Sequence, residues 1–276
     1  MSGQGLSRCA ARVAGRIEDV FADGGELLAA GLAVAWAVVV VRSAVVSRGG
    51  FLGGAPPVGV LTVLGIAVLL FGGQAVLADR IADDGLGATR VDAAVWSDVV
   101  GHRDAALTVA AEVLDVVGGT VALAVLALAV AVLLVLRDRL VDAAVVASAP
   151  AVSALLISGF KLGYGRPRPP ATERLVDVTG FSLPSGHALA ATVVLGVLAL
   201  VLARPLRRHA DRVALTVTAV LGVVAIGASR VYLGVHWATD VLVGWLLGGV
   251  WIALSAVALM LARGGSVTFG GGDRPT

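Results

Sequence analysis

Long runs of apolar residues, separated by shorter polar segments, dominate this chain. Seven runs lie at about residues 27–46, 56–78, 116–136, 143–160, 187–203, 213–229 and 241–262. A helix needs ~20 mostly apolar residues to cross the ~30 Å hydrocarbon core of a bilayer. The last six runs are apolar enough over such lengths, so we predict six membrane-spanning helices. The expected fold class is an all-α, polytopic transmembrane bundle.

The first apolar run is shorter, because Arg42 interrupts it, and three arginines at positions 8, 12 and 16 precede it. This pattern fits either a signal-like segment or a further spanning helix. No small-residue cleavage site of clear type follows, so we expect an uncleaved extra helix. The expected domains are an N-terminal region at 1–55, a membrane core at 56–263 and a flexible tail at 264–276.

The composition agrees with a membrane protein. Hydrophobic residues make up 58% of the chain, charged residues 14%, and the mean hydropathy is +0.95. Soluble domains carry about a quarter charged residues, so a water-soluble globule is excluded. The net charge is +2, and the arginines are scattered over the links between apolar runs without forming a basic stripe. We therefore expect no nucleic-acid partner. One lysine against many alanines, valines and glycines favours a prokaryotic source with a GC-rich genome.

The basic residues of the links also predict the orientation. Arginines gather in the links at 42–48, 137–139 and 204–212, which all fall on one side of the membrane. Cytoplasmic links carry the excess of positive charge, so this side is expected to face the cytoplasm. The opposite link, from Asp79 to Asp115, is acidic. Its valines at 91, 95 and 99 have the spacing of a helix that lies along the membrane interface.

Three polar clusters interrupt the apolar sequence. They are Lys161 to Pro169 (KLGYGRPRP), Pro184 to His187 (PSGH) and Ser229 to Asp240 (SRVYLGVHWATD). The first follows the fourth run, the second opens the fifth, and the third joins the sixth to the seventh. Counting the crossings places all three clusters on the same face, which we predict to be extracytoplasmic.

Each polar residue has an ordinary interpretation when it is taken alone. A lysine or arginine at a helix end can anchor the helix at headgroup level, and Ser185 can be a simple N-cap. Together, however, the clusters hold what phosphoryl transfer requires. His236 and Asp240 are four residues apart, so the carboxylate can orient one imidazole nitrogen while the other meets a substrate.

The remaining polar residues suit the phosphate itself. Lys161, Arg168 and Arg230 offer positive charge and hydrogen-bond donors to phosphate oxygens. Ser185 and the backbone N–H of Gly186 stand at an expected helix start, where anions are favoured. His187 follows them directly and is placed to protonate a leaving oxygen.

These residues resemble the type 2 phosphatidic acid phosphatase (PAP2) superfamily, which shares its active site with vanadium haloperoxidases. Lys161 with Arg168 and Pro169 match the first family signature, and Pro184 to His187 match the second. The third signature is matched by Ser229, Arg230, His236 and Asp240. The resemblance implies a six-helix core, a phosphohistidine at His236, Asp240 as its orienting partner and His187 as the acid. Lys161, Arg168, Ser185, Gly186 and Arg230 would bind the phosphoryl oxygens, and no metal ion or cofactor is implied.

The function expected from this resemblance is that of an integral plasma-membrane enzyme that hydrolyses a lipid phosphomonoester or diphosphate. Phosphatidic acid, phosphatidylglycerol phosphate and polyprenyl diphosphates all stay open as substrates. Vanadate-dependent oxidation is disfavoured because the haloperoxidases are soluble, and a lipid-binding or transport protein with a vestigial site is the alternative. Arg166 lies outside the signatures and is expected to be a spare phosphate ligand or an anchor.

Overall fold

The computed structural model of this protein describes residues 58–83, 85 and 87–264, and this part of the chain is helical without strands. The expected N-terminal helix at 27–46 lies outside the described residues. The helices are α2 (Val58–Asp83), α3 (Arg90–Gly101), α4 (Ala105–Val117), α5 (Thr120–Val135), α6 (Leu140–Tyr164), α7 (Gly186–Leu202), α8 (His209–Tyr232) and α9 (Ala238–Gly264), with a short 3-10 turn, η2 (Ala171–Glu173). The all-α prediction is confirmed.

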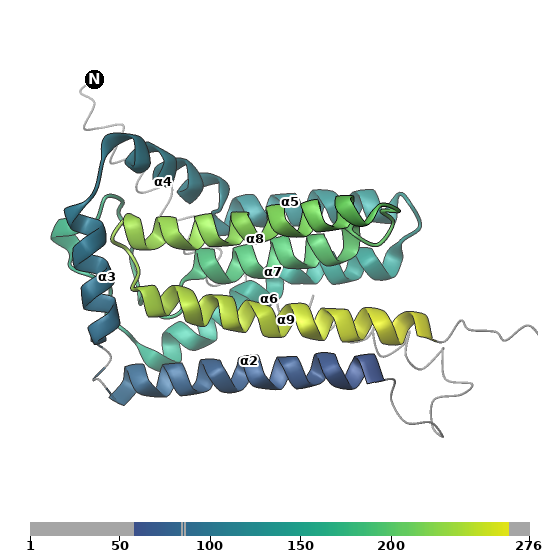
Figure 1. The fold of residues 1–276 in the computed structure, drawn as a ribbon, viewed down its shortest axis with the longest axis horizontal. Coiled ribbons are helices and arrows are strands. Elements are labelled where there is room, and N and C mark those ends of the chain that lie inside the picture. The colour runs from purple at the N-terminus through teal and green to yellow at the C-terminus, as the bar shows by residue number, and fades with distance from the viewer. Residues whose placement is uncertain (1–57, 84, 86, 265–276) are drawn as a thin grey trace, which may run out of the picture.

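Six of these helices run side by side along the long axis of the bundle (Figure 1). They are α2, α5, α6, α7, α8 and α9, and each corresponds to one of the six apolar runs predicted to span the membrane. Helix α7 packs against α5, α6, α8 and α9, and most of its 17 residues are buried. Helix α2 packs on α9 at the side of the bundle and exposes most of its apolar surface.

By length and composition, four of the described helices are suited to cross a membrane: α2, α6, α8 and α9. Helices α4 and α5 together form a fifth candidate, which is bent by 50° at the break between them. Two glycines, Gly118 and Gly119, occupy this break. Helix α7 is apolar but has only 17 residues, fewer than each of these four helices.

Helices α7 and α9 approach closely through a pair of glycines. A Cβ atom on Gly248 would lie 2.5 Å from the Cβ of Thr192, and one on Gly244 would lie 3.0 Å from the carbonyl oxygen of Ser185. Small residues at such positions let two helices pack closely. The close approach places the start of α7 beside the start of α9, where two of the three polar clusters lie.

Helix α3 lies across one end of the bundle (Figure 1). The helix predicted from the valine spacing is confirmed, but the stripe does not form a lipid-facing surface. Val95 and Val99 pack against buried residues of α7, α8 and α9, whereas Val91 is exposed. The helix begins with a capping box, in which Thr89 and Asp92 bond each other's backbone N–H groups. It therefore closes the end of the bundle that carries the polar clusters.

Candidate active site

His236 and Asp240 form the centre of the site, where the chain turns from α8 into α9. The imidazole is buried, and its Nδ1 lies 3.5 Å from Oδ2 of Asp240. The backbone N–H groups of Val235 and His236 both donate to the carbonyl oxygen of Arg230, at 3.2 and 3.3 Å. The turn thus holds the histidine against the carboxylate, as the four-residue spacing predicts.

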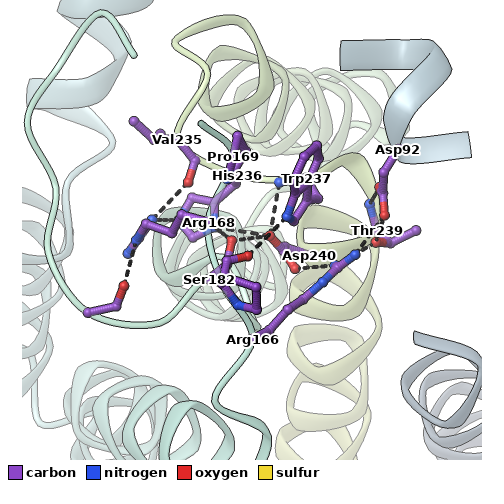
Figure 2. A network of polar contacts seen from close by, with 12 residues as sticks. Asp92, Arg166, Arg168, Pro169, Ser182, Val235, His236, Trp237, Thr239 and Asp240 are labelled. Atoms are coloured by element: carbon purple, nitrogen blue, oxygen red, sulfur yellow. Dashed lines mark hydrogen bonds and ion pairs between the residues drawn. The ribbon is translucent and has the colours of Figure 1, made fainter. Parts of the chain in front are cut away.

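Both carboxylate oxygens of Asp240 are held by further donors (Figure 2). Ser182 donates its hydroxyl to Oδ2 at 2.5 Å, and the backbone N–H of Trp237 donates to the same oxygen at 2.9 Å. The guanidinium of Arg166 donates to Oδ1 at 2.5 Å. The carboxylate is fully buried, so these bonds fix the position from which it faces His236.

Arg168 contacts the opposite nitrogen of His236. Its Nη1 lies 3.1 Å from the imidazole Nε2 and also donates to the carbonyl oxygen of Val235. A guanidinium can only donate, so Nε2 is the acceptor and the proton of the neutral ring resides on Nδ1, facing Asp240. The same guanidinium donates to the carbonyl oxygens of Thr179 and Gly180. These hydrogen bonds tie the loop before α7 to Arg168.

The environment keeps His236 neutral. Burial lowers the pKa of His236 to about 3, and the positive charges of Arg168 and Arg230 act in the same direction, against the opposing effect of Asp240. At pH 7 the ring therefore carries an unprotonated Nε2 with a lone pair. This is the form in which imidazole is a nucleophile.

His187 and Arg230 meet at a shared carboxylate, Asp115. His187 Nε2 lies 3.0 Å from Asp115 Oδ1, and Nη1 of Arg230 bonds the same oxygen. Asp115 stands in the last turn of α4, directly before the bend. The sequence interpretation counted it only among the acids of a long link. The crossing count could have found it, because it places the end of that link on the same face as the three clusters.

Three further predicted residues lie at the same end of the bundle. Ser185 is buried and donates its backbone N–H to the carbonyl oxygen of Asp240 at 3.1 Å, and Gly186 begins α7 directly after it. Lys161 lies in the last turn of α6. Within the part of the chain that the structure describes, the Ser185 hydroxyl and Nε of Arg230 have no hydrogen-bond partner. Buried polar atoms of this kind are normally satisfied, so an anion in the site would complete them.

Arg166 corrects the sequence interpretation. It was expected to be a spare phosphate ligand or an anchor at headgroup level, yet its side chain is fully buried. Both of its Nη atoms bond side-chain oxygens, those of Asp240 and Thr239 on one side and that of Asp92 on the other. The guanidinium is therefore enclosed behind the carboxylate of Asp240, and both of its terminal nitrogens are already bonded.

Besides Asp115, the structure adds two residues that the sequence reasoning missed, Ser182 and Asp92. Ser182 lies two residues before the PSGH cluster, and Asp92 belongs to α3. Neither belongs to a signature, so only their contacts reveal their place in the site.

Among residues 58–83, 85 and 87–264, no group of three or more His, Cys, Asp and Glu side chains has the arrangement of a metal site.

Comparisons with known proteins agree with the resemblance. Residues 142–262 match the family model of the PAP2 superfamily. An undecaprenyl-diphosphatase from Sulfolobus acidocaldarius is 40% identical over 81 residues, which are 29% of this chain and 34% of that protein. Phosphatidylglycerophosphatase B from Bacillus subtilis is 44% identical over 79 residues, which are 27% of this chain and 37% of that protein. The aligned part thus spans about a third of these curated relatives.

A solved structure extends the similarity over the fold. The crystal structure of a transmembrane PAP2 type phosphatidylglycerolphosphate phosphatase from Bacillus subtilis aligns with a TM-score of 0.62 and 28% sequence identity. The alignment covers 68% of this chain and 93% of that one. The predicted resemblance to the PAP2 superfamily is thereby confirmed.

Proposed function

We propose that this integral membrane protein, whose residues 142–262 match the family model of the PAP2 superfamily, is a lipid phosphatase in which His236 forms a phosphohistidine without help from a metal ion. One observation carries the proposal. The buried imidazole of His236 is neutral, with its proton directed to Asp240 and its Nε2 lone pair directed to Arg168. A guanidinium at that nitrogen stands where a phosphate would be received.

In the first step, Nε2 of His236 attacks phosphorus and the P–N bond forms. The bond from phosphorus to the lipid oxygen breaks, and its electron pair leaves with that oxygen, which takes a proton from His187. Arg168 moves from Nε2 to the phosphoryl oxygens as the substrate enters. The imidazole becomes positively charged, and the carboxylate of Asp240 stabilises this charge.

In the second step, water attacks the phosphohistidine. The new P–O bond forms while the P–N bond breaks, and the electron pair returns to Nε2 of His236. His187, now neutral, takes the proton of the attacking water, as microscopic reversibility requires. Asp115 holds the ring of His187 in the position that both steps use.

The phosphoryl oxygens are stabilised by groups that are part of the chain. Lys161, Arg168 and Arg230 supply positive charge, while the Ser185 hydroxyl and the Gly186 N–H supply donors at the start of α7. Preorganised charges of this kind stabilise a phosphoryl-transfer transition state in the manner of a bound cation. These residues recognise only the phosphate, so phosphatidic acid, phosphatidylglycerol phosphate and polyprenyl diphosphates all stay candidate substrates.

Purified protein in detergent should release phosphate from at least one of these three lipids in the presence of excess EDTA. The expected rate equals that in Mg²⁺, because the cations that serve the phosphate are arginine and lysine side chains. Colorimetric phosphate release over the panel measures both the activity and the substrate. A strict requirement for added Mg²⁺ contradicts the metal-free mechanism. Binding of a lipid without any release of phosphate indicates the binding or transport alternative.

We also propose that the site faces the extracytoplasmic side of the plasma membrane. The arginine-bearing links at 137–139 and 204–212 join helices at the end of the bundle opposite the site, and links with such charge are cytoplasmic. The proposal predicts that, in a Cys9→Ser background, Asp177→Cys reacts in intact cells with a membrane-impermeant maleimide and Arg208→Cys does not.

Both labelling positions are exposed, so accessibility within the protein does not limit the reaction. Labelling after the cells are opened serves as the control, because both cysteines should then react. The reverse pattern in intact cells would place the chemistry in the cytoplasm and would direct the substrate search to lipids of that leaflet.

A further inference from the structure

We propose that Arg166 and Asp92 are positioning residues of this site. They form a buried chain of carboxylate, guanidinium and carboxylate that runs from α3 to Asp240 and fixes that residue against His236. The inference rests on the proposed function, because it concerns how the partner of the nucleophile is held. Neither residue belongs to the three signatures.

The chain of contacts is continuous and fully buried (Figure 2). Arg166 donates from Nη1 to Asp240 Oδ1 at 2.5 Å and from Nη2 to Asp92 Oδ2 at 2.7 Å. Thr239 closes a ring, since its backbone N–H donates to Asp92 Oδ1 and its hydroxyl donates to Asp92 Oδ2. Asp92 thereby holds both the guanidinium and the first turn of α9, in which Asp240 lies.

The start of helix α3 fixes the position of the Asp92 carboxylate. The capping box fixes the carboxylate at the helix start, where the hydroxyl of Thr89 donates to Asp92 Oδ2 at 2.9 Å. Trp96, one turn further along α3, packs against Trp237 with ring centroids 6.3 Å apart. The guanidinium of Arg166 lies 6.0 Å from the Trp237 ring. Helix α3 thus contacts Trp237 and Thr239, which lie between His236 and Asp240 in the chain.

The charges explain why such a costly arrangement is useful. Burying ions is expensive, and an apolar cluster would hold α3 in place without that cost. Two carboxylates share one guanidinium here, so the cluster of Asp92, Arg166 and Asp240 carries a formal excess of one negative charge on the Nδ1 side of His236. Phosphorylation of Nε2 makes the ring positive, and the negative cluster stabilises this charge from the Nδ1 side. Because Asp92 shares the positive charge of Arg166, Asp240 is not fully neutralised and stays available to the imidazole. Arg166 in turn supplies the cation that two buried carboxylates need when they lie close together.

The geometry also requires an arginine. Its planar fork reaches two carboxylates from one side chain, which the single ammonium of a lysine cannot do in the same geometry. The proposal therefore distinguishes the effect of charge from the effect of the fork. Arg166→Lys keeps the charge and loses the fork, whereas Arg166→Gln loses both.

The experiment compares Arg166→Gln, Arg166→Lys, Asp92→Asn and the double variant Asp92→Asn/Arg166→Gln. Steady-state kcat and KM are measured on the lipid phosphate that the wild type hydrolyses, together with inhibition by orthovanadate as a phosphate mimic. We expect kcat to fall on the order of 10²-fold in Arg166→Gln and ~10-fold in Asp92→Asn, the range of residues that orient functional groups. KM and vanadate inhibition should stay within about threefold, because the phosphate ligands are untouched.

The double variant is the sharpest part of the test. It removes one positive and one negative charge, so its kcat should be no lower than that of Arg166→Gln alone. Arg166→Lys should lie between Arg166→Gln and the wild type. A matched control is Arg103→Gln, which removes an arginine that ties the same end of the bundle to carbonyl oxygens of Tyr232 and Glu173 without contacting Asp240. Its kcat should stay near the wild-type value.

Thermal unfolding in detergent, followed for every variant, separates positioning from loss of fold. The comparison is made when Arg166→Gln and Arg103→Gln unfold at the same temperature. The inference is overturned if kcat then falls no further in Arg166→Gln than in Arg103→Gln. It is also overturned if the losses of the two single variants multiply in the double variant. Should Arg166→Gln not fold, Arg166→Lys is compared with the control by the same criterion. A wild type that hydrolyses none of the lipids refutes the proposed function, whereas an active wild type with an unaffected Arg166→Gln refutes this inference only.

Discussion

His236→Ala is expected to abolish phosphate release, with a loss of turnover on the order of 10⁴-fold or more, as for nucleophiles of other covalent enzymes. The variant lacks the only atom proposed to form the bond to phosphorus, and Arg168 and Asp240 then have no imidazole between them. The measurement is the initial rate of phosphate release from the lipid that the wild type prefers. Trapping with radiolabelled substrate, followed by measurement of the acid-labile phosphate bound to the protein, reports whether the phosphohistidine still forms.

The loss must arise from chemistry and not from unfolding. The substitution removes a buried ring but leaves Asp240 bonded to Ser182, to the backbone of Trp237 and to Arg166. We therefore expect the variant to be expressed and to elute from a detergent column at the wild-type volume. A folded His236→Ala protein with near wild-type activity would show that the phosphohistidine assignment is wrong.

The fold was predictable because hydrophobic length is a strong signal in a membrane protein. The six apolar runs correspond to six helices of the bundle, of which α2, α6, α8 and α9 are long enough to cross a membrane, and the valine spacing at 91, 95 and 99 located α3 correctly. The direction in which α3 faces was not predictable from spacing alone. An apolar stripe suits lipid and a protein surface equally well, and here Val95 and Val99 pack on the bundle.

The central residues of the site were predictable because their types and spacings are specific, and crossing counts place them on one face. Asp92 and Asp115 were not predictable in the same way. Each acts on residues far away in the sequence, with a separation of 147 between Asp92 and Thr239 and of 115 between Asp115 and Arg230. Such contacts arise from the packing of α3 and α4 across the end of the bundle.

The two arginines of the RPRP segment illustrate the same limit. Arg166 and Arg168 are two residues apart, and composition alone makes both of them candidate phosphate ligands. In the structure, Arg168 turns to His236 and the loop before α7, whereas Arg166 turns to Asp92 and Asp240. The buried carboxylates of Asp92 and Asp240 hold Arg166, and only Asp240 was recognised from the sequence.

Asp240→Asn is expected to keep a measurable trace of the activity, with kcat lowered by about 10⁴-fold, as for the acid of a catalytic triad. The nucleophile survives in this variant, so attack on phosphorus is still possible. The positive charge that develops on the imidazole, however, loses its carboxylate partner. The amide must also place an NH₂ group against Arg166 on one side or against Ser182 and Trp237 on the other, and all of these donate to the native carboxylate.

The variant should nevertheless stay folded, because Asp92 continues to balance the charge of Arg166 at 2.7 Å. This makes the kinetic loss separable from stability. In rapid-quench experiments, formation of the phosphohistidine should slow in proportion to kcat, whereas KM should change little, because Arg168, Ser185 and Arg230 are intact. If Asp240→Asn instead raised KM and left the rate of phosphoenzyme formation unchanged, Asp240 would serve substrate binding, and the assignment of His236 and Asp240 as nucleophile and orienting partner would have to be abandoned.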